Sequence, residues 1–129
     1  RIRLCHGDLI NKADWRYRLL HRLLRHPLTF RVARLLPQSA IAQLRHKLQR
    51  TSKGRYRQDR SRWDYRAIIR SYATSIRCQG YDALLLGHFH LPFIEHQKPF
   101  TLVSLGDWIS QFSYAELSEG RLKLLTYQP

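Results

Sequence analysis

Two short apolar segments of this chain each end in a turn that pairs glycine with histidine. The segment Tyr81–Leu86 is followed by Gly87–His90, with the sequence Gly-His-Phe-His, and the first residues of the chain are followed by His6 and Gly7. Each segment has the length and residue types of a buried strand, and glycine lets the backbone turn directly after it. Because the ends of parallel strands meet at one edge of a sheet, the pattern favours an α/β fold in which these histidines converge.

His6, His88 and His90 are therefore the candidate metal ligands and catalytic residues. Imidazole groups suit a divalent ion such as Mn, Fe, Zn or Ni. Asp8 and Asp107 are the acidic residues near these motifs, whereas a two-metal site needs a bridging carboxylate and more ligands than these residues provide. The alternative interpretation is that the histidines are ordinary polar residues of strand-end turns.

The charge of the chain is concentrated in its middle segment. The net charge is +14, and residues 12–77 alone contain 18 Lys and Arg residues against three acidic residues. A surface of this kind favours anionic partners such as phosphates, acidic lipid headgroups or nucleic acid.

The same middle segment has apolar residues at helical spacing. Asn11 or Asp14 is the predicted cap of the first helix, and Pro27 is predicted to open the second. A third helix is predicted over about 38–50, a loop over 50–62, where no apolar period exists, and a last helix before Gly80. Strands are predicted over 81–86, 91–96, 100–105, 112–117 and 121–127.

These motifs together resemble a known family. The order of His6-Gly7-Asp8, an arginine-rich insert, Gly87–His90 and Leu105–Trp108 is similar to the C-terminal half of the calcineurin-like metallophosphoesterases. Within that family the chain is most similar to the UDP-2,3-diacylglucosamine hydrolases of lipid A synthesis. The resemblance implies an α/β fold, part of a metallophosphoesterase β-sandwich with a basic helical insertion. Residues 1–11 would form a core strand and metal-ligand loop, 12–80 the insert or lid, and 81–129 the C-terminal strands.

The resemblance also implies roles for individual residues. His6 and His88 would ligate one ion of a metal pair, with manganese expected, and His90 would ligate the other. The family's other ligands lie in upstream motifs that these residues do not contain. The chain has no methionine and begins as a strand, so we expect a piece of a longer protein. Without the missing N-terminal half of the domain, we expect weak metal binding and little or no activity.

Substrate contacts are implied in the turn after the first strand and in the insert. The acyl chains would lie against an apolar lining of the lid, although the same residues could equally form a helix-packing core. The implied substrate-binding residues are Asp8, Trp15, Leu19, Ser52, Lys53 and Arg55. Tyr56 and Asp59 stand where some members carry further sugar contacts, which leaves the exact substrate open.

The implied function is the attack of water on the phosphoanhydride of a nucleotide-diphospho-lipid, releasing UMP and 2,3-diacylglucosamine 1-phosphate. The implied location is the bacterial cytoplasm, at the acidic surface of the inner membrane. One alternative is a metallophosphoesterase of another phosphodiester or nucleotide. The other is a non-enzymatic nucleic-acid-binding module, which the charge and aromatic residues such as Trp63 allow but which leaves the placed histidines unexplained.

Overall fold

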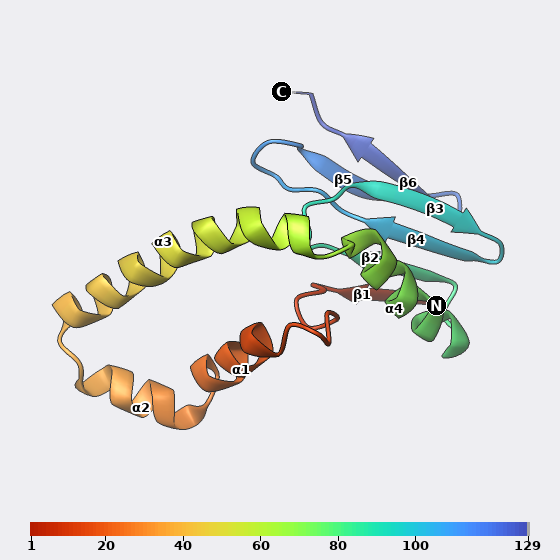
Figure 1. Ribbon diagram of the computed structural model, residues 1–129. Coiled ribbons are helices and arrows are strands. Elements are labelled where there is room, and N and C mark those ends of the chain that lie inside the picture. The colour runs from red at the N-terminus through yellow and green to blue at the C-terminus, as the bar shows by residue number, and fades with distance from the viewer. Residues whose placement is uncertain (129) are drawn as a thin grey trace. The chain divides into compact units, whose positions relative to one another are not determined.

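The computed structural model describes residues 1–128, with side chains for residues 1–50 and 62–128. The contacts divide the chain into two units, and Figure 1 shows their helices and strands. The sheet unit consists of Arg1–Ile10 and the chain from Tyr65 onward, and the helical unit consists of Asn11–Asp64. The elements of the sheet unit are β1 Ile2–Cys5, α4 Tyr65–Cys78, β2 Ala83–Leu86, β3 Phe93–Gln97, β4 Phe100–Ser104, β5 Ser113–Ser118 and β6 Arg121–Thr126. The elements of the helical unit are α1 Trp15–Leu24, α2 Pro27–Leu35 and α3 Gln38–Arg62.

The larger sheet brings the ends of three parallel strands to one edge. Its strand order is β1-β2-β4-β3, in which β1, β2 and β4 are parallel and β3 is antiparallel to β4. Cys5 is in register with Leu86, and Leu86 is in register with Ser104. The segments that leave these three strands therefore begin side by side, as the positions of the histidines predicted.

The two faces of this sheet are covered by different elements. On one face, Ile69, Ala73 and Ile76 of α4 pack against the buried side chains of Leu84 and Leu102. Their spacing of four and three residues places them on one stripe of the helix. On the other face, Val103 packs with Leu122 of the β5–β6 hairpin. The alternation of side chains along each strand separates the two cores, and each fully buried Leu or Ile contributes roughly 1.5–3 kcal/mol.

The predicted strands are confirmed, with ends that differ by one or two residues. The smaller sheet is the antiparallel pair of β5 and β6, in which Ser118 pairs with Arg121. Glu119 and Gly120 form the two-residue turn, and both have positive φ, at 52° and 73°. Two positive φ angles match the twist of the flanking strands, so this turn suits the predicted hairpin.

The helical unit follows the predicted caps but not the predicted loop. The Asp14 side chain accepts a hydrogen bond from the Tyr17 backbone N–H at 3.0 Å, and Pro27 opens α2. The loop expected over 50–62 is wrong, because α3 continues through Arg62. Arginine, lysine and glutamine are good helix formers, and no proline interrupts the segment, so a helix persists without an apolar stripe.

Apolar side chains of the helical unit are exposed rather than packed into a core of their own. Among its residues with described side chains none is buried. Trp15 is 61% exposed and Leu35 is 85% exposed. Ile41, Leu44 and Leu48 are exposed along the first half of α3. The described side chains of this unit therefore form no buried core.

The boundary of the helical unit differs from the predicted insert of 12–80. The unit ends at Asp64, and α4 packs on the larger sheet. The reason is the stripe of buried residues on α4, which α1 and α2 lack. Among the described residues, no helix is long and apolar enough to span a membrane.

Candidate functional site

His6 and His88 meet at the edge where the parallel strands end. The Nε2 atom of His6 lies 3.2 Å from the Nδ1 atom of His88, and the two rings meet edge to face with centroids 5.0 Å apart. The Gly87 backbone N–H donates to the carbonyl oxygen of His6 at 3.2 Å. This bond continues the parallel β1–β2 pairing one step beyond the strands, and it sets the spacing of the two imidazoles.

The histidine loop, Gly87–His90, has a constrained backbone. The Phe89 N–H donates to the Gly87 carbonyl at 2.8 Å across His88, whose φ is 68°. This is a γ-turn with a positive central φ, a rare and strained form. His90 also has a positive φ, of 50°. Each such residue costs about 1–3 kcal/mol and persists only where its surroundings hold it, which occurs mainly at functional sites.

Phe89 is the residue that holds this loop. Its side chain is buried in the core under α4, and its ring lies 5.0 Å from that of Tyr65. A Cβ on Gly7, whose φ is +96°, would meet the Phe89 ring at 3.4 Å. The middle residue of His-Phe-His is thus fixed in the core, while the histidines on either side stay partly accessible at the sheet edge.

His90 lies against the carboxylate of Asp107. Its Nδ1 atom lies 3.4 Å from Oδ2 of Asp107, in the segment that follows β4. Backbone N–H groups of Ser110, Ile109 and Gln111 donate to the same carboxylate. These donors lower the pKa of Asp107 well below its ordinary value, because they stabilise the ionised form.

The surroundings of His88 favour the neutral form of its imidazole. Burial of the imidazole is the main cause that lowers the pKa of His88, and charge on His6 and His90 lowers it further, while Asp8 opposes the shift. A lowered pKa leaves the ring unprotonated at neutral pH, which is the form that binds metal ions. The same interactions place His6, Asp8 and His90 within electrostatic range of His88.

The His6–His88 pair fits a metal ion. Two nitrogens that bind the same ion at about 2.0–2.1 Å are roughly 2.8–3.0 Å apart in octahedral geometry and roughly 3.3–3.4 Å apart in tetrahedral geometry, so both geometries together span roughly 2.8–3.4 Å. The observed separation of 3.2 Å falls in that range. Among the residues with described side chains, no group of three or more His, Cys, Asp or Glu is arranged to hold an ion. The two nitrogens of His6 and His88 therefore suit an ion that is also bound by further ligands.

The implied substrate residues fall in different parts of the chain. Asp8 is half-buried in the turn after β1, next to the histidines. Trp15 and Leu19 lie exposed on α1 in the helical unit. The side chains of Ser52, Lys53 and Arg55 lie outside the described part of the structure. Sequence reasoning assigned no role to Asp107. A serine three positions after an aspartate is, however, a signal of a capping turn.

Comparison with known proteins finds no matching family model. It does find curated relatives, each with the name UDP-2,3-diacylglucosamine hydrolase. The relative from Neisseria meningitidis serogroup B is 27% identical over 111 residues, which are 85% of this chain and 45% of the relative. That from Pseudomonas putida KT2440 is 31% identical over 84% of this chain and 46% of the relative. That from Pseudomonas syringae pv. tomato is 31% identical over 94% and 50%.

The chain thus spans about half the length of the curated relatives it matches. The matches cover between 84% and 98% of this chain. The predicted similarity to the UDP-2,3-diacylglucosamine hydrolases is confirmed, over most of this chain and about half of each relative.

Proposed function

We propose that this chain carries the histidine-bearing part of a metal-dependent phosphoesterase of the UDP-2,3-diacylglucosamine hydrolase type. The observation that carries the proposal is the approach of His6 Nε2 to His88 Nδ1 at 3.2 Å, at the edge where three parallel strands end. The reaction is attack of water on the phosphoanhydride, with release of UMP and 2,3-diacylglucosamine 1-phosphate. The names of the relatives support this substrate.

The proposed cofactor is a pair of divalent ions, manganese first, with iron, zinc or nickel as alternatives. A bound pair would supply Lewis-acid activation of water and neutralise negative charge at phosphorus. His6 and His88 would hold one ion and His90 the other. The remaining ligands, including a bridging carboxylate, would come from the half of the relatives' length that this chain does not span. The chain alone would then bind metal weakly and have little or no activity.

The helical unit is proposed as the lid that receives the acyl chains. Its exposed apolar side chains, such as Trp15, Leu19 and Leu44, support this role. Residues 11–64 also contain 15 Lys and Arg residues against three acidic residues. Each basic residue near an anionic membrane surface adds about 1 kcal/mol to binding, so the unit suits peripheral attachment to the bacterial inner membrane.

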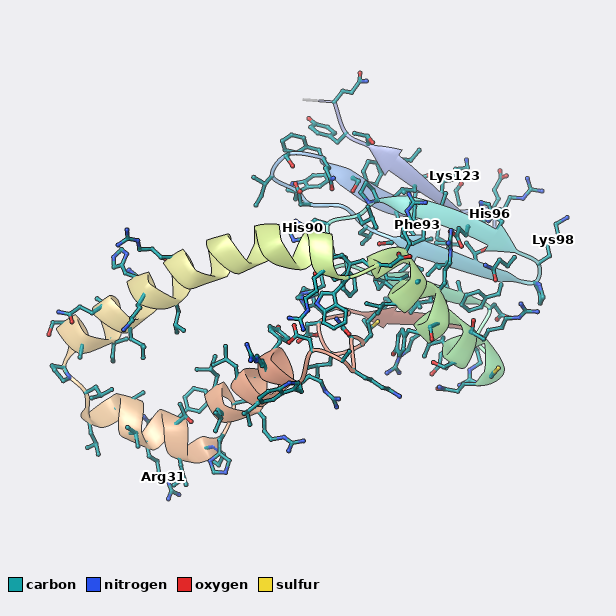
Figure 2. The ribbon with its side chains drawn as sticks, in the orientation of Figure 1. Arg31, His90, Phe93, His96, Lys98 and Lys123 are labelled. Atoms are coloured by element: carbon teal, nitrogen blue, oxygen red, sulfur yellow. The ribbon has the colours of Figure 1, made fainter. Side chains whose placement is uncertain are left out.

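The test is a chimera in which this chain replaces the matching half of the Pseudomonas syringae relative. We expect manganese-dependent release of UMP from UDP-2,3-diacylglucosamine, and its loss in His88→Ala and His90→Ala. The matched control is His96→Ala, because His96 lies on β3, away from the histidine loop, and contacts Thr101 (Figure 2). The control should keep full turnover.

The other outcomes of this test select between the remaining functions. Turnover of simple phosphodiesters without UMP release would keep the metal site and change the substrate. Inactivity on both substrate classes, together with steeply salt-dependent binding of the chain to polynucleotides, would support the nucleic-acid-binding alternative.

A further inference from the structure

The two carboxylate oxygens of Asp107 have different partners. Oδ1 accepts hydrogen bonds from the backbone N–H groups of Ile109 at 2.9 Å, Ser110 at 2.5 Å and Gln111 at 3.1 Å. Oδ2 lies 3.4 Å from Nδ1 of His90 and 3.0 Å from the Ser110 hydroxyl. One oxygen therefore holds the segment 107–111 in place, and the other faces the imidazole.

Asp107 is fixed on both sides of its backbone. Its own N–H donates to the Gln111 side-chain oxygen at 3.0 Å, and the N–H of the preceding Gly106 donates to the Ser113 hydroxyl at 2.8 Å. The Asp107 side chain is only 12% exposed, while that of His90 is 38% exposed. The carboxylate is held in position without any ligand, and the imidazole beside it remains reachable from solvent.

A carboxylate in this position selects one tautomer of the imidazole. An ionised carboxylate can only accept hydrogen bonds, so the ring nitrogen that faces it must carry the proton. For His90 that nitrogen is Nδ1. Nε2 is then the nitrogen without a proton, which is the form that a metal ion requires. Carboxylates that contact metal-binding histidines act in this way, and they also fix the orientation of the ring.

We propose that Asp107 is the positioning residue of His90, holding the proton on Nδ1 so that Nε2 can bind a metal ion. The role of Nε2 rests on the proposed function, whereas the tautomer rests on the geometry alone. His88 has a different arrangement, since its Nδ1 atom faces the imidazole of His6.

The test is the tautomer of His90 in the metal-free protein, measured by nitrogen-15 NMR of the histidine rings. The pH is set about two units above the ordinary histidine pKa of about 6.5, so that the rings are neutral. Comparison with His90→Ala identifies the signals. We expect the Nδ1–H form in the wild type, and finding the Nε2–H form there would overturn the proposal without any further variant.

Asp107→Asn is the informative substitution because it changes only one side of the carboxylate. Its amide oxygen keeps the position of Oδ1, since three backbone donors face that position. The amide NH₂ then replaces Oδ2 and donates to Nδ1, which moves the ring proton to Nε2. We expect His90 to change to the Nε2–H form, and an unchanged tautomer would contradict the role of Asp107.

Ser110→Ala is the matched control. It removes the hydroxyl that contacts both carboxylate oxygens but leaves the carboxylate itself. We expect the Nδ1–H form to persist, and a change equal to that of Asp107→Asn would overturn the assignment to the carboxylate. In the chimera, Asp107→Asn should weaken manganese affinity by about 10–100-fold. Because the tautomer is read without metal, absence of UMP release would contradict the proposed function and the metal-binding role of Nε2, but not the control of the His90 tautomer by Asp107.

Discussion

The Nε2 atom of His6 lies 3.2 Å from the Nδ1 atom of His88, although 82 residues separate them in the chain. The contact follows from the parallel register of β1 and β2, in which Cys5 is opposite Leu86. A shift of one residue would turn the alternate side chains to the other face and separate the two rings. The packing of the sheet therefore decides the geometry of the candidate site.

Gly7→Ala should destabilise the protein by about 1–2 kcal/mol, because a residue with a Cβ is strained at positive φ. The φ of Gly7 is +96°, and its new Cβ would also touch the Phe89 ring at 3.4 Å. Gly87→Ala is the control, since the nearest atom to its Cβ would be the His6 carbonyl oxygen at 3.8 Å. Urea unfolding of both variants measures the difference, and equal losses would contradict the strain at Gly7.

Phe89→Ala should lower the free energy of unfolding by about 3–5 kcal/mol, because it leaves a cavity in the core under α4. The Phe89 side chain is 6% exposed, whereas that of Phe30 is 64% exposed. Phe30→Ala should change stability by no more than about 0.5 kcal/mol. Thermal and urea unfolding test the pair. A small loss for Phe89→Ala would mean that another residue anchors the histidine loop.

Two buried serines should respond to alanine substitution in opposite directions. The Ser104 hydroxyl is buried and has no hydrogen-bond partner among the described residues. Ser104→Ala removes this unsatisfied group and should stabilise the protein by about 1 kcal/mol. The Ser113 hydroxyl accepts from the Gly106 N–H, so Ser113→Ala should destabilise it by about 1 kcal/mol. Chemical denaturation gives both signs, and a loss of stability in Ser104→Ala would reveal a hidden partner.

Glu95→Gln should make the free energy of unfolding vary less with pH in the acid range. Arg70 donates through Nε to both carboxylate oxygens of Glu95 and through Nη2 to one of them at 2.7 Å. These hydrogen bonds, more than the charge of Arg70, lower the pKa of Glu95 in the folded protein. Because the folded pKa is depressed, the stabilisation is present above the unfolded pKa of about 4.3 and is lost as pH falls through the folded value.

The wild type should therefore be more stable than Glu95→Gln at neutral pH, and the difference should shrink as pH falls from about 5 to about 3. Arg70→Gln should show the same convergence, because it removes the other partner of the pair. Unfolding midpoints measured across this range test the prediction. A difference that stays constant with pH would show that the ion pair does not link α4 to β3 energetically.

The parts of the fold that depend on residues close together in the sequence could be predicted from the sequence. The strands follow from short apolar runs, the hairpin turn at Gly120 from its glycine, and the helix starts from Asp14 and Pro27. Each of these signals acts over a few residues, through backbone dihedrals or a local hydrogen bond. The placement of His6 and His88 after strands was local as well, and so was predictable.

Tertiary structure alone decided which of these pieces meet. The pairing of β1 with β2 brings His6 to His88, and the return of the chain after β4 brings Asp107 to His90. Tertiary contacts also decided that α4 packs on the larger sheet and belongs to the sheet unit. Such contacts depend on the burial of apolar faces from distant segments, and no local pattern specifies which partner a face will find.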